Sequence, residues 1–161
     1  METKKRCGWC EGDALYESYH DNEWGVPLYD DEQLFEFLIL ETFQAGLSWI
    51  TILRKRENFR EAFDNFDYKK VADYSDEKIQ ELMNNSGIIR NQQKIRAAIS
   101  NAQEILKVSE EFGSFRVYID KLLWDQGIDG TLKALKKRFS RVGPATGMMF
   151  LWSIGEETPR P

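Results

Sequence analysis

The chain of 161 residues contains little of the chemistry that marks metal, redox or secreted proteins: two cysteines, one histidine and four prolines. Cys7 and Cys10 lie three positions apart, and we interpret them as reduced thiols rather than a strained local disulfide. No apolar run reaches the roughly 18 residues that a membrane span requires. The charged start METKKRCGWC also lacks the apolar stretch of a signal peptide. We therefore expect a cytoplasmic protein with no membrane partner.

Positive charge is also scarce, since the formal net charge is −5. This balance argues mildly against nucleic acid as a partner, because DNA-binding domains usually carry a basic footprint. The charge is unevenly distributed, however. Acidic residues dominate 11–42 and 61–81, whereas KALKKRFSR (133–141) carries five positive charges and LRKRENFR (53–60) carries four. Each run alone is typical of a solvated helix surface, but together they are compatible with a basic face on an acidic protein.

Helical periodicity dominates from about residue 30 to residue 155, and strand-like alternation appears nowhere for long. Asp30 is placed to cap a helix that is apolar nearly all round from Leu34 to Leu40, which predicts a central, buried helix. Further helices are expected after Ser48 as far as Phe63, after Ser75, around 95–106, and at 114–124, 130–139 and 145–154. The fold class is all-α, and we expect one compact helical domain over 1–161.

Glu41 lies on the same helical face as Leu34, Leu38 and Ala45, so its carboxylate should point toward the core. A carboxylate in that position pairs with a cation, shifts its pKa, or faces a cavity that holds a polar ligand. A buried ion pair with an arginine, or an end-of-helix glutamate reaching water, is the structural alternative.

Five large rings share the first 50 residues with the polar run HDNE: Trp9, Tyr16, Tyr19, Trp24 and Trp49. Aromatic faces on a pocket wall suit a flat ligand, above all a nucleobase taken out of its stack. For any single ring, ordinary core packing is the alternative.

The segment KKRFSRVGPATGMMF reads as a basic helix, a short turn and an apolar helix, which is the pattern of a helix-hairpin-helix near 131–154. Gly143 permits a tight turn and a close backbone approach, and the N–H groups that begin the next helix can receive a DNA phosphate. Arg138 and Arg141 would add charge without reading the base sequence. An ordinary helix–helix connection is the alternative.

These features occur together in one family. Over about residues 6–143, and most distinctively in YHDNEWGVP and QAGLSWITILRKREN, the chain closely resembles the bacterial 3-methyladenine DNA glycosylase I (TAG) family of the helix-hairpin-helix glycosylases. The resemblance implies excision of 3-methyladenine from alkylated double-stranded DNA by a monomer. It gives Glu41 the place of the glutamate that hydrogen-bonds the damaged base, and Leu47 the place of the residue that fills the gap left by the flipped nucleotide. The implied base-binding residues are Trp9, Tyr16, Tyr19 and Trp49.

The resemblance ends before the C-terminus. Cys7 and His20 match the two N-terminal ligands of the family's zinc site, but MMFLWSIGEETPRP supplies neither the histidine nor the cysteine that would complete it. We therefore expect no cofactor for the chemistry and leave zinc open. Two other functions remain in view: a DNA-binding relative that recognises damage without turnover, and a small metal or redox module built around Cys7, Cys10 and His20.

Overall fold

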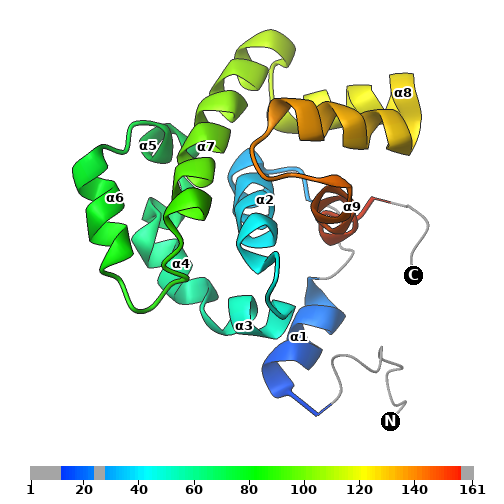
Figure 1. Cartoon of the computed structure of the whole chain (residues 1–161). Coiled ribbons are helices and arrows are strands. Elements are labelled where there is room, and N and C mark those ends of the chain that lie inside the picture. The colour runs from blue at the N-terminus through cyan, green and yellow to red at the C-terminus, as the bar shows by residue number, and fades with distance from the viewer. Residues whose placement is uncertain (1–11, 24–27, 157–161) are drawn as a thin grey trace.

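A buried helix, α2 (Asp31–Gln44), forms the centre of the fold, and every residue from Leu34 to Phe43 is buried. The structure is a computed structural model that describes residues 12–23 and 28–156, without the side chains of His20 and Asp21. Asp30 caps α2 as predicted, because its carboxylate accepts a hydrogen bond from the Glu32 N–H at 3.2 Å. An apolar surface on all sides needs neighbours on all sides, and α3, α7, α8 and α9 pack against α2 (Figure 1).

The regular elements of the described residues are all helical. They run in the order α1 (Ala14–Asn22), α2, α3 (Trp49–Arg54), α4 (Arg56–Ala62), the 3-10 turn η1 (Asp64–Phe66), α5 (Tyr68–Ala72), α6 (Asp76–Met83), α7 (Gln92–Phe112), α8 (Phe115–Arg138) and α9 (Pro144–Ser153). The all-α prediction is confirmed. Within this part of the chain no helix is both long enough and apolar enough to cross a bilayer.

The expected single helix from Ser48 to Phe63 is wrong, because the chain turns at Lys55 and forms α3 and α4 instead. Lys55 leaves helical geometry with φ −95° and ψ 1°, and its N–H bonds to the Ile52 carbonyl. The turn lets α4 place the Phe59 ring 4.9 Å from that of Phe43 on α2. Packing of the two rings thus accompanies a break that helical periodicity alone does not reveal.

The helices expected at 114–124 and 130–139 are the two arms of α8, which is broken at Gly127 (φ 69°, ψ −170°). That conformation is nearly exclusive to glycine, since it carries no Cβ. Asp31, the first residue of α2, caps α8 by accepting from the N–H groups of Phe115 and Arg116 at 3.0 and 3.1 Å. The same central helix therefore fixes where α8 starts.

Candidate active site

The carboxylate of Glu41 is buried near the C-terminal end of α2 and is only half satisfied. Its Oε1 accepts a hydrogen bond from the Ser153 hydroxyl at 2.9 Å, while its buried Oε2 has no hydrogen-bond partner among the described residues. Within the same residues no lysine or arginine forms an ion pair with it, so the ion-pair alternative finds no support there. Burial raises the pKa of the Glu41 carboxyl to about 7, against the hydrogen bond from Ser153, which lowers it.

Tyr19, one of the predicted site residues, lies near this carboxylate, and its ring packs on that of Trp49. The ring centroids of Tyr19 from α1 and Trp49 from α3 are 5.5 Å apart with an interplanar angle of 48°. Burial and the negative charge of Glu41 raise the pKa of the Tyr19 phenol above its ordinary value, so it stays protonated at neutral pH. Trp49 Nε1 is buried without a hydrogen-bond partner in the described part of the chain. The cluster thus offers one free acceptor and one free donor.

The other predicted residues of the base site lie on or before α1. Tyr16 is one helical turn before Tyr19, half-buried against the core. Trp9 and Cys7 lie outside the described residues, as does the side chain of His20. Across the described side chains no group of three or more histidines, cysteines, aspartates or glutamates could hold a metal ion. Whether Cys7 and His20 bind zinc therefore stays open.

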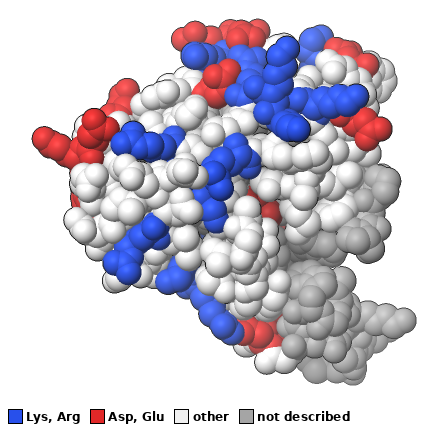
Figure 2. All heavy atoms as spheres, viewed as in Figure 1, with Lys and Arg blue, Asp and Glu red and all other residues white. Residues whose placement is uncertain are grey.

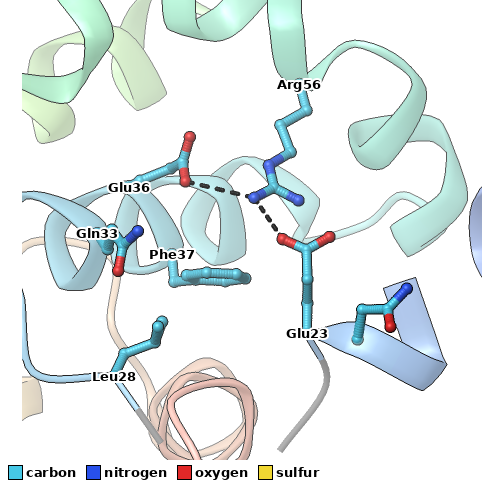
Figure 3. A pocket seen from close by; sticks show the side chains of 7 residues that line it. Glu23, Leu28, Gln33, Glu36, Phe37 and Arg56 are labelled. Carbon is cyan, nitrogen blue, oxygen red and sulfur yellow. Dashed lines mark ion pairs between the residues drawn. The ribbon is translucent and has the colours of Figure 1, made fainter. Parts of the chain in front are cut away.

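An arginine ties α1 to α2 beside this site. Arg56 at the start of α4 reaches Glu23 at 2.5 Å and Glu36 at 3.6 Å, and its guanidinium carbon lies 5.5 Å from the centroid of the Phe37 ring. Figure 3 shows the guanidinium between the two carboxylates, at the edge of a pocket of about 180 Å³. Glu23 follows Tyr19 by four residues, so this bridge fixes the end of the helix that carries Tyr19.

The loop between α2 and α3 presents Leu47, which is exposed as the resemblance implies for a residue that enters DNA. Gln44 holds it from both sides: the Leu47 N–H donates to the Gln44 carbonyl, and Gln44 Nε2 donates to the Leu47 carbonyl, each at 2.7 Å. Lys94 of α7 reaches under the loop and donates to the carbonyls of Phe43 and Ala45 at 2.9 and 2.8 Å. The loop is therefore rigidly supported.

The C-terminal hairpin consists of the second arm of α8, the turn 139–143 and α9, and it is fastened to α7. The buried Asn101 side chain of α7 donates to the Ser140 carbonyl and accepts from the Ser140 N–H, at 3.1 and 2.7 Å. Arg141 has φ 61°, and its guanidinium donates to Gln93 at 3.2 Å. Gln93 is next to Lys94, so the turn lies beside the support of the Leu47 loop.

The prediction that Gly143 makes the tight turn possible is not supported by its backbone conformation. The left-handed residue of the turn is Arg141, whereas Gly143 has φ −71° and ψ 176°, a conformation that any residue adopts. What Gly143 offers is space, because a Cβ placed there meets no atom within 4 Å among the described residues. The close backbone approach predicted for it stays a prediction.

Arg138, predicted to add charge toward DNA, is paired with acidic side chains of α7. Its Nε donates to Glu104 at 2.7 Å, its terminal nitrogens reach Glu111, and its guanidinium lies over the ring of Tyr118. These contacts favour a structural role in which Arg138 joins α8 to α7. The DNA contact of Arg138 stays a prediction, and its ion pairs with Glu104 and Glu111 argue against that contact.

The face of the molecule in Figure 2 carries groups of positive side chains, with acidic side chains beside the largest group. Figure 2 shows several groups of lysine and arginine side chains on the face that carries α7, with the largest over the upper part, where Figure 1 places α8. The hydrogen bonds of Lys94 and Asn101 described above join α2, the Leu47 loop and the hairpin turn to α7.

A family model of the methyladenine glycosylases matches residues 9–143. DNA-3-methyladenine glycosylase 1 of Escherichia coli (strain K12) is 41% identical over 169 residues, which cover 94% of this chain and 90% of the relative. A crystal structure of 3-methyladenine DNA glycosylase I (TAG) superposes with a TM-score of 0.87 at 41% identity, covering 94% of this chain and 93% of that one. A variant of such an enzyme in complex with 3-methyladenine gives 0.86 at 34% identity, covering 92% and 90%. The chain belongs to the methyladenine glycosylase family.

Two residues of the site were not predicted from the sequence. Lys94 offered a signal, because a lysine four residues before Ala98 falls at the helical spacing of the apolar stripe on α7. Ser153 offered none, since it lies 112 residues from Glu41 and only the packing of α9 against α2 brings the two together.

Proposed function

We propose that the protein is a DNA glycosylase that excises 3-methyladenine from alkylated double-stranded DNA by hydrolysis of the N-glycosidic bond, leaving an abasic site. The observation that carries the proposal is the buried Glu41 carboxylate, with one oxygen unpartnered among the described residues, near Tyr19, whose ring packs on that of Trp49. Family membership and the names of the relatives support the substrate.

The chemistry follows from the charge of the damaged base. Methylation at N3 places a positive charge on adenine and weakens its bond to the sugar, so the leaving base needs little protonation. When the bond breaks, its electron pair goes to the base and neutralises it, and the sugar becomes oxocarbenium-like. Water then adds to the sugar carbon and loses a proton. We assign no general base to this step.

The site residues recognise the cation. The Glu41 carboxylate attracts it by charge and accepts a hydrogen bond through Oε2, while the faces of Tyr19 and Trp49 add cation–π attraction. Trp9 and Tyr16 are proposed as further walls of the pocket. A damaged base also costs less to extrude from the duplex than an intact one, which adds to selectivity.

The DNA would lie across the Leu47 loop and the C-terminal hairpin. Leu47 is proposed to fill the gap left by the extruded nucleotide, and Arg141 and the backbone at Gly143 to contact phosphates. The protein would act as a cytoplasmic monomer that needs no cofactor for the chemistry.

The test is the release of free methylated bases from alkylated duplex DNA, separated by chromatography, by the wild type, Glu41→Gln and Glu32→Gln. Glu32 is an exposed carboxylate on the same helix and serves as the matched control. We expect 3-methyladenine from the wild type and the control, and a large loss with Glu41→Gln. Tight binding to the alkylated duplex without release by the wild type would instead identify a DNA-binding relative without turnover.

A further inference from the structure

Ser153, the last residue of α9, contacts Glu41 of the site. Its side chain is buried, and its hydroxyl donates to Glu41 Oε1 at 2.9 Å. Among the described residues, Glu41 is the side chain to which this hydroxyl donates. A helical serine commonly bonds to a carbonyl of its own helix, whereas the hydroxyl of Ser153 donates to a side chain of another helix, α2.

The hydrogen bond makes the two carboxylate oxygens of Glu41 unequal. Oε1 is satisfied by Ser153, and Oε2 is buried with no partner within the described residues. The terminal torsion of a glutamate is broad and has no strong intrinsic preference. A contact from outside α2 is therefore needed to hold the carboxylate plane, and Ser153 is the described residue that provides it.

We propose that Ser153 is a positioning residue for base recognition, whose hydroxyl holds Glu41 Oε1 and so leaves Oε2 as the acceptor for the extruded base. This inference rests on the proposed function of the same site. In this proposal Ser153 does not touch the base; it acts through Glu41.

The hydrogen bond from Ser153 also affects the ionisation of Glu41. A donated hydrogen bond stabilises the ionised carboxylate, and it opposes the burial that raises the Glu41 pKa. A cationic base requires that ionised form. Tyr19 is the titratable group of α1 near Glu41. The charge of Glu23 raises the pKa of Tyr19, and the charge of Arg56 lowers it. Removal of the Ser153 hydroxyl should therefore raise the pKa of Glu41 further.

The test compares Ser153→Ala and Ser153→Thr with a matched control, Ser109→Ala. The hydroxyl of Ser109 on α7 is also buried but has no hydrogen-bond partner in the described structure, so its removal deletes the same atom away from the site. Single-turnover release of 3-methyladenine from alkylated duplex is measured from pH 5 to 9, with the stability of each variant from urea unfolding.

We expect Ser153→Ala to lower the rate at pH 7 by about tenfold, the worth of one hydrogen bond to a charged group. Its acidic limb should also move to higher pH, whereas a purely structural role would leave the limb in place. Ser153→Thr, which keeps the hydroxyl, should restore both quantities, and Ser109→Ala should match the wild type.

Three outcomes would overturn the inference. A wild-type rate and limb for Ser153→Ala, with Glu41→Gln inactive, would remove Ser153 from recognition and leave the proposed function intact. A lower rate with an unmoved limb that Ser153→Thr does not restore would show a structural role only. Failure of the wild type to release 3-methyladenine would remove the function and the inference together.

Discussion

The ammonium group of Lys94 lies 2.9 Å from the carbonyl oxygen of Phe43, so a residue near the start of α7 closes the end of α2. The last carbonyls of a helix have no partner inside it, and a cation there also interacts favourably with the helix dipole. Burial and the positive charge of Arg141 lower the pKa of Lys94. The contact therefore joins α7 to the helix of the carboxylate and to the Leu47 loop, and the neighbouring Gln93 accepts a hydrogen bond from Arg141 of the hairpin turn.

Lys94→Met should destabilise the fold, because the carbonyls of Phe43 and Ala45 lose a charged donor. We expect a loss of about 2 kcal/mol in the free energy of unfolding, within the range for hydrogen bonds to charged groups. Urea unfolding measures it, with Lys107→Met on the exposed side of α7 as the control. Equal stability of the two variants would contradict the capping role of Lys94.

Arg56→Met should weaken both the fold and the site, because it removes the bridge from Glu23 to Glu36 and leaves charges partly buried. A loss of about 2 kcal/mol is expected, less than for a fully buried ion pair. The apparent KM for alkylated DNA should rise, since α1 carries Tyr19. Arg54→Met is the matched control, because its ion pair with Asp13 is exposed and such pairs contribute little to stability. Indistinguishable KM values for Arg56→Met and Arg54→Met would show that the Arg56 bridge does not contribute to substrate binding.

Features of the fold and the site were predictable from the sequence where they depend on residues close together in the chain. The buried helix α2, its cap at Asp30 and the inward direction of Glu41 all follow from helical spacing, which reports one face of one helix. The two arms of α8 were predictable because Gly127 interrupts the pattern. Spacing does not reveal which residue of another helix lies opposite that face.

Three features therefore escaped prediction. Ser153 meets Glu41 only after α9 packs on α2, and Arg138 finds Glu104 only after α8 packs on α7. Asp64, Asn65 and Phe66 adopt consecutive positive φ values in η1, a conformation unfavourable for each residue alone. Stacking of the Phe63 and Phe66 rings at 5.8 Å accompanies that turn, and no local propensity indicates it.

Glu41→Gln should stabilise the protein at alkaline pH. Burial raises the folded pKa of Glu41 to about 7 from its usual 4.5, so ionisation opposes folding progressively above pH 4.5 and fully above pH 7. The cost is on the order of 3 kcal/mol, at 1.36 kcal/mol per pKa unit. The stability advantage of Glu41→Gln should therefore be largest at pH 8 to 9 and vanish near pH 4.5. Urea unfolding across this range measures it, with Glu32→Gln, which removes an exposed carboxylate on the same helix, as the control.

Gly143→Ala should separate DNA binding from stability. The Cβ meets no described atom and φ is ordinary, so the free energy of unfolding should change by less than about 1 kcal/mol. If a phosphate approaches the backbone there, affinity for duplex DNA should fall several-fold. Gly127→Ala is the contrasting variant, because its φ of 69° predicts a loss of about 1–3 kcal/mol. Unchanged affinity in Gly143→Ala would remove Gly143 from the DNA contact.

The position of α9 sets a length scale for the proposed reaction. The helix begins directly after Gly143, where a phosphate is proposed to bind, and ends at Ser153, which holds Glu41. Ten helical residues span about 15 Å at 1.5 Å per residue. In the proposed complex the helix α9, rather than a loop, would set the distance between the bound phosphate and the extruded base. The register of the damaged nucleotide along the duplex would be fixed by the number of turns in α9.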